Sequence, residues 1–193
     1  MLINFDQMVM EFGINIKGAI HVGGHTGEEA PFYLQHTTNI HIFEPIKECF
    51  DRIPNNISKY NCALGAQECQ MEMYIASNMA SSSLLKPKKH LVANTHITFE
   101  ERMTVPVKTL DSFNIKGCNF IDLDVQGYEL EVLKGGIETM KEIDTVYTEV
   151  NTDELYENNC FLEDMDKWLE NLGFKRVLLE MTSQNWGDAL YKK

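Results

Sequence analysis

The chain has 193 residues, of which 44% are hydrophobic, and it carries a formal net charge of −12. This size and composition predict a single globular domain with a well-buried core, and no apolar run reaches the length of a membrane span. The negative net charge argues against DNA or RNA as a partner, because phosphate contacts need a basic face.

The N-terminal residues and the cysteines indicate the compartment. Residues 1–6 lack the basic region and cleavage site of a secretory signal, and the five cysteines are irregularly spaced without a Cys-x-x-Cys pair. We therefore expect a soluble cytoplasmic protein with reduced thiols. Residues 5–12 predict a short helix that ends at Gly13 and packs outside the sheet, within an N-terminal helical extension of residues 1–17.

Segments with strand-like and helix-like periodicity alternate along most of the chain. The predicted strands span residues 18–22, 39–43, 60–64, 70–75, 103–110, 119–125, 145–150, 174–179 and 186–191. The predicted helices after the first span residues 28–35, 45–53, 128–140 and 162–172. This alternation predicts an α/β fold with a mainly parallel sheet flanked by helices, and the short connection between the last two strands predicts an antiparallel hairpin.

Two segments need separate predictions. Pro106 predicts that its strand lies at an edge, because proline cannot donate to a sheet ladder. Residues 78–96 have little periodicity, and a loop of this length in a compact domain is usually functional. Its basic run at 86–90 predicts a solvated loop, with contact to an acidic group of a substrate as the alternative. His90 and His96 are too far apart for a metal pair on one helical turn, so we predict no metal site.

Two aspartates lie on one face of the predicted strand at 119–125. Period two places Phe120, Asp122 and Asp124 on that face. A carboxylate inside a buried strand is costly unless it is hydrogen-bonded or lies at the strand's end, where ligands of open α/β sheets bind. Asp124 lies at the end and is the first candidate for a catalytic base, with a cap for the helix turn at Gly127 as the alternative. Asp122 is expected to have a structural hydrogen-bonding role.

A glycine-rich turn and a later carboxylate predict a site for an adenosine-containing ligand. Gly23, Gly24 and Gly27 follow the first strand, and Glu44 ends the second strand about twenty residues later, the spacing at which a carboxylate meets a ribose. A dinucleotide calls for Gly-x-Gly-x-x-Gly, from which this turn departs. S-adenosylmethionine needs a glycine-rich turn and a carboxylate for its ribose, so the turn favours it. An NAD-dependent oxidoreductase is the alternative.

Six short motifs occur along the chain in order, at residues 20–28, 43–45, 61–65, 82–84, 109–113 and 121–135. Together they resemble the FkbM-type family of S-adenosylmethionine-dependent methyltransferases. The resemblance covers about residues 18–150. It implies one class I methyltransferase domain with a Rossmann-like sheet over residues 1–193. It also implies methyl transfer, mostly to hydroxyl oxygen on sugars or natural products.

The turn, the strand ends and the resemblance together predict the site residues. We expect cofactor contacts from His21, Gly23, Gly24, His25, Thr26, Gly27, Glu44, Pro45, Asn61, Cys62, Ala63, Ser82, Ser83, Asp122 and Asp124. A neutral hydroxyl is a poor nucleophile and benefits from a general base. We expect that base to be Asp124, with Glu149 and Asp111 as weaker candidates.

The chain departs from the family pattern at two positions. His21 stands where the first strand of such enzymes commonly carries an aspartate, and Gln126 stands where relatives often have a glutamate. An amide does not titrate, so Gln126 cannot handle a proton. These departures keep a non-catalytic cofactor-binding domain as a second alternative.

We therefore predict a methyltransferase that uses S-adenosylmethionine to methylate a hydroxyl of a sugar or small metabolite. Its partner is a small-molecule or glycan acceptor, with neither nucleic acid nor a membrane involved. The loop at 78–96 is expected to shape the choice of acceptor.

Overall fold

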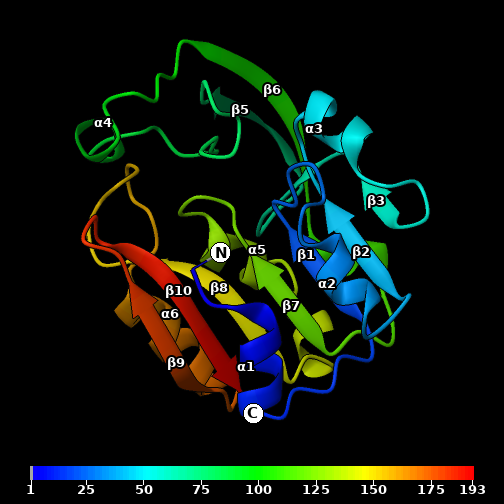
Figure 1. Cartoon of the computed structure of the whole chain (residues 1–193). Coiled ribbons are helices and arrows are strands. Elements are labelled where there is room, and N and C mark those ends of the chain that lie inside the picture. The colour runs from blue at the N-terminus through cyan, green and yellow to red at the C-terminus, as the bar shows by residue number, and fades with distance from the viewer. Residues whose placement is uncertain (1) are drawn as a thin grey trace.

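A seven-stranded sheet runs through the centre of the molecule in the order β3-β2-β1-β7-β8-β10-β9 (Figure 1). The structure, a computed structural model, describes residues 2–193. The strands are β1 Ala19–Val22, β2 Ile40–Phe43, β3 Ser58–Tyr60, β7 Phe120–Leu123, β8 Thr145–Asn151, β9 Lys175–Met181 and β10 Trp186–Lys192. All are parallel except β10, which runs antiparallel to both neighbours. The predicted parallel sheet and C-terminal hairpin are thus confirmed.

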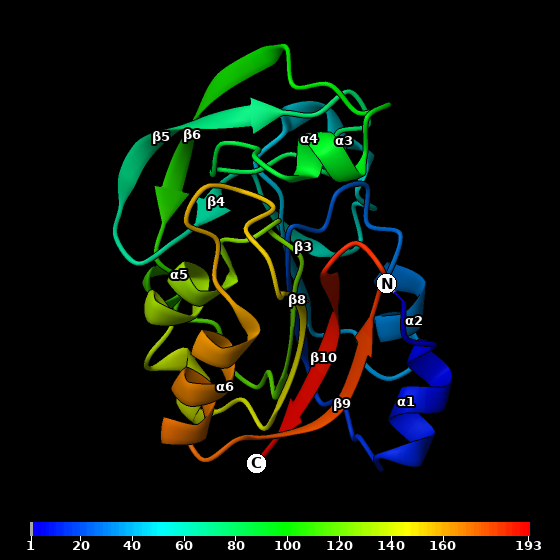
Figure 2. The ribbon, with the colours of Figure 1, turned by 90° about the vertical axis from the view of Figure 1, so that its left-hand side faces the viewer.

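Helices cover both faces of this sheet, as Figure 2 shows from the side. One face carries α1 Phe5–Glu11 and α2 Ala30–Leu34, and the other carries α5 Glu129–Lys134 and α6 Leu162–Asn171. The segment expected as an N-terminal extension therefore contributes a seven-residue helix that packs on the sheet.

Side-chain alternation along β7 separates the two cores. Phe120 packs edge to face with Phe5 of α1, at 5.7 Å between ring centroids. Ile121 and Leu123 point the other way and join the core beneath α5 and α6. Each buried side chain of this size contributes about 1.5–3 kcal/mol, so the register of β7 is strongly specified. That register fixes the face on which Asp122 lies.

A second sheet of three strands stands beyond the carboxyl ends of the parallel strands (Figure 1). Its order is β4-β6-β5, with β4 Ala63–Leu64, β5 Cys69–Ile75 and β6 Glu101–Lys108. The single strand predicted at 60–64 is wrong, because the chain turns at Asn61 and passes from one sheet to the other. The Asn61 amide fixes this turn by donating to the carbonyls of Glu44 and Pro45, at 2.9 and 3.0 Å.

The edge strand expected from Pro106 is also wrong, because β6 is the middle strand of the small sheet. The proline is tolerated there because β4 pairs only with Val107 and Lys108. The edge of β6 that faces β4 is therefore unpaired at Pro106, which lacks the N–H that a partner would need.

Three helical predictions need correction. Pro45 precedes α3 Lys47–Arg52 instead of lying in its first turn. The helix expected at 128–140 ends at Lys134, with Gly135 as its C-cap, and the one-turn 3₁₀ helix η2 Thr139–Lys141 follows. The loop expected at 78–96 contains a short helix, α4 His90–Ala93. A further 3₁₀ turn, η1 Leu110–Phe113, leads to β7.

Candidate active site

Two cavities meet at the carboxyl end of β7 and share Asp124 and Ala80. We call the larger one, of about 850 Å³ with its open mouth, the acidic cavity, because its lining includes the carboxylates Glu29, Asp122, Asp124, Glu149 and Asp188. The smaller one, of about 520 Å³, is the apolar cavity, lined chiefly by Val22, Phe43, Ile46, Leu64, Met73 and Leu84. Among the residues that line them, neither cavity has a lysine or an arginine.

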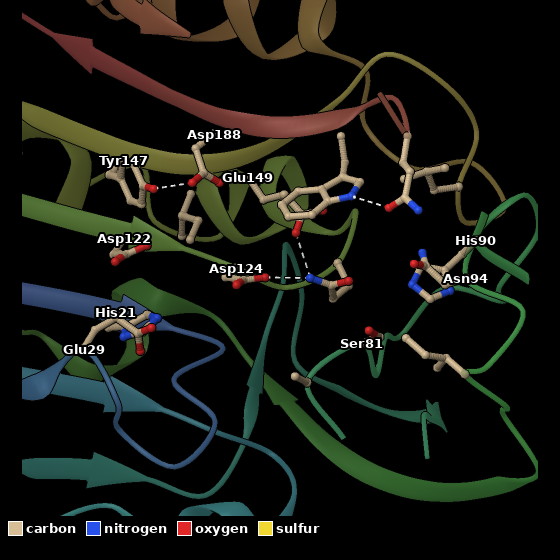
Figure 3. A pocket seen from close by; sticks show the side chains of 17 residues that line it. His21, Glu29, Ser81, His90, Asn94, Asp122, Asp124, Tyr147, Glu149 and Asp188 are labelled. Atoms are coloured by element: carbon tan, nitrogen blue, oxygen red, sulfur yellow. Dashed lines mark hydrogen bonds between the residues drawn. The ribbon is translucent and has the colours of Figure 1, made fainter. Parts of the chain in front are cut away.

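The loop after β7 presents Asp124 to both cavities. Its backbone N–H donates to the Val22 carbonyl at 3.0 Å, which holds the loop against the end of β1. Glu129 accepts hydrogen bonds from the N–H groups of Val125 and Gly127, at 3.1 and 3.0 Å. The helix turn at Gly127 is thus capped by Glu129, and the Asp124 carboxylate is left facing the acidic cavity (Figure 3).

Gln126 joins Asp124 to a second carboxylate. Its Nε2 donates to Asp124 Oδ1 and to Glu149 Oε2, both at 2.7 Å (Figure 3). Its Oε1 accepts from the Tyr156 hydroxyl at 3.0 Å. Both N–H bonds need an amide, since a glutamate here would place a third carboxylate against the first two. Burial raises the pKa of Glu149 well above its usual range, and the negative charge of Asp124 raises it further. Desolvation likewise raises the pKa of Asp124, and the hydrogen bond from Gln126 opposes that rise.

His21 and Asp122 lie side by side on β1 and β7, as register partners. Asp122 accepts a hydrogen bond from the Tyr33 hydroxyl. Burial raises the pKa of Asp122 to about 6, although the nearby His21 and the Tyr33 hydrogen bond lower it. His21 is buried, lines the acidic cavity, and has no hydrogen-bond partner for Nδ1 within residues 2–193. Asp122 therefore places a carboxyl group beside position 21, from the neighbouring strand.

Asp188 completes the acidic cavity on the same face of the sheet, from the strand next to β8. It lies on β10, opposite Glu149 of β8. It accepts hydrogen bonds from the Tyr147 hydroxyl and from the backbone N–H of Leu2, the latter at 2.5 Å. The N-terminal segment thus reaches the wall of the cavity.

Glu44 is buried at the end of β2 and lines the apolar cavity. Its Oε2 accepts from the N–H of His25 at 2.9 Å, and its Oε1 accepts from the N–H of Ile46 at 2.7 Å. Burial raises its pKa to about 7 against the effect of these two bonds. Each carboxylate oxygen has a second lone pair, so Glu44 retains two acceptor sites for a ligand.

The glycine turn is explained largely by close packing. A side chain at Gly23, where φ is +85°, would lie 1.8 Å from the Asp124 carbonyl oxygen. A side chain at Gly24 would lie 2.2 Å from the Ile42 side chain. Both N–H groups donate to the Phe43 carbonyl, at 3.0 and 3.1 Å. The missing side chains therefore let the turn fit between β2 and the loop after β7.

The predicted site residues divide into those that line a cavity and those that do not. The acidic cavity receives His21, Asp122, Asp124 and Glu149. The apolar cavity receives Gly23, His25, Glu44, Pro45, Cys62, Ala63, Ser82 and Asp124. Those that line neither are Gly24, Thr26, Gly27, Asn61, Ser83 and Asp111.

Like Asn61, the side chains of Ser83 and Asp111 lie outside the cavities and make hydrogen bonds that stabilise nearby loops. The Ser83 hydroxyl donates to the carbonyl of Gln126 at 2.8 Å. The Asp111 carboxylate accepts from the N–H groups of Glu138 and Thr139, at 2.9 and 2.8 Å, and so caps the turn before η2.

Sequence reasoning did not single out several residues that line the cavities. The acidic cavity also includes Glu29, Ser81, Asn94, Tyr147, Trp186 and Asp188, and the apolar cavity includes Met73, Met79 and Tyr128. Asp188 carried a signal, because a charged residue in the otherwise buried run 187–191 needs a reason to be there. Ser81 and Asn94 lie in the segment 78–96 that was expected to shape the choice of acceptor. Because this segment has no periodicity, no sequence signal distinguished these two residues from their neighbours.

Residues 2–193 contain neither a cluster of metal-ligating side chains nor a membrane-spanning helix. No group of three or more histidine, cysteine, aspartate or glutamate side chains in that range is placed to hold a metal ion. None of the helices there combines the length and the apolar character that a bilayer crossing demands.

Known proteins share this fold. A structure of methyltransferase FkbM from Methylobacillus flagellatus KT aligns over 99% of this chain and 48% of its own, with a TM-score of 0.62 and 14% identity. A structure of magnesium protoporphyrin IX methyltransferase (ChlM) from Synechocystis PCC 6803 aligns over 98% of this chain and 76% of its own, with a TM-score of 0.55 and 10% identity. The fold is therefore that of the class I methyltransferases, as predicted.

Sequence comparison adds the family. The 2-O-methyltransferase NoeI of Sinorhizobium fredii (strain NBRC 101917 / NGR234) is 35% identical over 81 residues, which are 40% of this chain and 33% of NoeI. The chain thus matches about a third of that relative and about half of the FkbM structure. The sequence model described as the methyltransferase FkbM domain matches residues 21–176. The chain belongs to the FkbM methyltransferase family.

Proposed function

We propose that this protein is an S-adenosylmethionine-dependent methyltransferase that methylates a hydroxyl oxygen of a sugar or small metabolite. The observation that carries the proposal is the meeting of two chemically different cavities at Asp124. Family membership and the bound S-adenosylmethionine of the ChlM structure support the cofactor. The name of NoeI, a 2-O-methyltransferase, supports oxygen as the accepting atom.

The chemistry of the two cavities fits this cofactor. An apolar cavity with one inward carboxylate, Glu44, suits an adenosine whose ribose diol needs an acceptor. S-adenosylmethionine also carries a sulfonium and an ammonium, which suit a lining with carboxylates and no lysine or arginine. The unpartnered Nδ1 of His21 and the adjacent Asp122 suit its amino-acid end. In this proposal Cys62 and Ala63 lie near the adenine.

The cofactor supplies a methyl group on a sulfonium sulfur, and the protein has to align the acceptor oxygen and remove its proton. Asp124 is the proposed base. Its raised pKa makes it a stronger proton acceptor than an ordinary aspartate. Gln126 fixes the orientation of Asp124 by its hydrogen bond, and it holds Glu149 at the same amide. The charge of Asp124 raises the pKa of Glu149, so the two carboxyl groups that Gln126 joins disfavour carrying two negative charges together.

The alternatives to this function have different ligands or no turnover. An NAD-dependent oxidoreductase is disfavoured by the family and by the glycine pattern, and a non-catalytic domain would bind the cofactor without transferring the methyl group. Asp111 has no part in the proposed mechanism, because it lines neither cavity. The cytoplasmic location stays a prediction from the sequence.

Calorimetric titration tests the cofactor. We expect S-adenosylmethionine and S-adenosylhomocysteine to bind at micromolar concentration and NAD not to bind. Absence of binding at high micromolar concentration, or a preference for NAD, would contradict the proposal. A methyl-release assay with labelled cofactor and a pool of glycans and metabolites then separates an enzyme from a non-catalytic domain.

A further inference from the structure

The acidic cavity has an uncharged end. Its carboxylates lie along the edge of the main sheet, whereas Ser81, His90 and Asn94 lie together at the opposite side (Figure 3). Asp124 lies between the two ends (Figure 3). The cationic groups of the proposed cofactor are matched by the carboxylate end. The uncharged end is thus left for the acceptor.

His90 is the most unusual residue at this end. It is 5% exposed and lines the acidic cavity, and its Nδ1 has no hydrogen-bond partner in the described part of the chain. Its ring packs against both Phe99 and Tyr156, at 5.5 and 5.3 Å between centroids. Burial lowers the pKa of His90, so the ring is neutral near pH 7. A buried polar atom without a partner calls for an explanation, and a bound molecule provides one.

Asn94 continues the same surface. It follows α4 directly, and its backbone N–H donates to the His90 carbonyl at 2.9 Å. It lines the acidic cavity and is only partly buried. Its side-chain amide adds both a donor and an acceptor to those of the His90 ring.

Backbone pairing holds α4 in place over the cavity. The N–H groups of Lys88 and His90 donate to the Leu155 carbonyl, at 2.8 and 3.0 Å, and the N–H of Glu157 donates to the Lys86 carbonyl at 2.8 Å. We call this pairing of residues 86–90 with residues 153–157 the clasp.

The lysines of the clasp point away from the cavity into ion pairs. These pairs are Lys86–Glu157, Lys88–Glu154 and Lys89–Asp153. All three lysine side chains are largely exposed. The basic run at 86–90 therefore offers the cavity no cation, and His90 is the member of that run that lines it.

We infer that His90 and Asn94 bind the acceptor, and that the acceptor enters as an uncharged molecule without phosphate or carboxylate groups. This inference rests on the proposed function. An anionic group at this end would lie in a cavity whose lining includes five carboxyl groups and no lysine or arginine, and none of Ser81, His90 and Asn94 would bring it a full positive charge. A neutral hydroxylated molecule finds an imidazole, an amide and the Ser81 hydroxyl there.

Binding of charge-matched sugars tests the inference. The probes are methyl glucoside, methyl glucuronide, glucose 6-phosphate and methyl glucosaminide, added to the protein saturated with S-adenosylhomocysteine. Histidine side-chain NMR signals report contact with His90. We expect the neutral glycoside to shift the His90 signals and the two anions to bind at least tenfold more weakly. Preferential binding of either anion, or of the cationic amine, or no shift by any probe, would overturn the inference.

Variants locate the effect. His90→Gln and Asn94→Ala should each weaken binding of the neutral glycoside at least fivefold, with affinity for S-adenosylhomocysteine unchanged. Asn94→Lys adds a positive charge at this end and should allow the anionic probes to bind. This variant leaves the buried His90 ring unchanged. The control is His96→Gln, because His96 is exposed and lines neither cavity. Equal glycoside binding by all four variants would remove His90 and Asn94 from the site. If the unmodified protein does not bind S-adenosylhomocysteine, that result would instead count against the proposed function.

Discussion

The apolar cavity and the acidic cavity share Asp124 but handle charge in opposite ways. In the apolar cavity Glu44 is buried among hydrophobic side chains, and two backbone N–H groups hold its carboxylate. In the acidic cavity the carboxylates accept mainly from side chains, namely Gln126, Tyr33 and Tyr147, and Asp188 also accepts from the backbone N–H of Leu2. Most substitutions keep a backbone donor, whereas they can remove a side-chain donor. The comparison therefore predicts that substitutions change the acidic cavity more readily than the apolar cavity.

Removing the base at the junction should have the largest effect. Asp124→Asn keeps the size of the side chain but cannot accept the acceptor proton. We expect methyl release to fall about 10²–10⁴-fold, the usual contribution of a general base. Affinity for S-adenosylhomocysteine should change much less. Labelled methyl transfer and calorimetry on the same variant measure the two effects, and unchanged turnover would return Asp124 to a structural role.

The wall between the cavities should be the most sensitive to added bulk. Gly23→Ala places a methyl group against the Asp124 carbonyl at a positive φ, so we expect a loss of about 3 kcal/mol or more in the free energy of unfolding. Gly13→Ala is the matched control. Its φ is also positive, at +58°, but nothing lies within 4 Å of the added carbon. It should cost only about 1 kcal/mol. Equal losses in chemical denaturation would show that backbone strain, not packing, sets the need for glycine.

Glu44 should distinguish the two cavities by ligand. Glu44→Gln removes the charge but keeps an acceptor oxygen for one of the two N–H groups. We expect affinity for S-adenosylhomocysteine to fall about 10- to 100-fold, since a hydrogen bond to a charged group is worth about 1.5–3 kcal/mol. Binding of a neutral sugar probe to the acidic cavity should change little. Unchanged cofactor affinity in calorimetry would remove Glu44 from the cofactor site.

The raised pKa values predict a pH dependence of stability. Glu44 and Asp122, one from each cavity, have pKa values of about 7 and 6 in the folded protein, above the ordinary values of 4.5 and 3.8. Between about pH 4 and 7 the folded state therefore binds more protons than the unfolded state, so stability falls as the pH rises. Each group contributes at most about 3 kcal/mol. Thermal melting of the ligand-free protein should therefore show a higher Tm at pH 5 than at pH 7. A Tm that rises toward pH 8 would contradict these pKa directions.

Asp111 lies outside both cavities, so its substitution should have the smallest effect on activity and serves as the control for the other variants. Asp111→Asn weakens the cap before η2 and should cost about 1 kcal/mol in thermal or chemical denaturation. Cofactor affinity and methyl release should stay as in the unmodified protein. A large loss of turnover at unchanged stability would bring Asp111 back as a catalytic candidate.

Local sequence patterns were sufficient for the fold where residues repeat with a clear period. Alternation in β7 and the spacing in α6 predicted strand, helix and buried face correctly. The pattern failed at Asn61, because the residues on both sides are strand-like and only the contacts of its side chain show that the chain changes sheets. It also failed at Pro106, because the length of β4 is not visible in the sequence of β6.

The candidate site was predictable where it follows strand ends. His21, Glu44, Asp124 and Glu149 each lie in or after a predicted parallel strand, and the sheet brings them to one edge. The bridging role of Gln126 was not predictable, because it depends on a left-handed backbone, with φ at 56°, that turns the amide back between two carboxylates. The wall at α4 was not predictable either, since tertiary pairing with residues 153–157 fixes its place.

The clasp has a consequence for how relatives of this protein diverge. Its two halves are far apart in the chain, yet each lysine of one half faces a carboxylate of the other. Changing one half alone leaves like or unpaired charges facing each other, so we expect the halves to be exchanged together. Grafting both segments from another family member onto this chain should then carry over that member's preference for its acceptor, while the sheet beneath stays as it is.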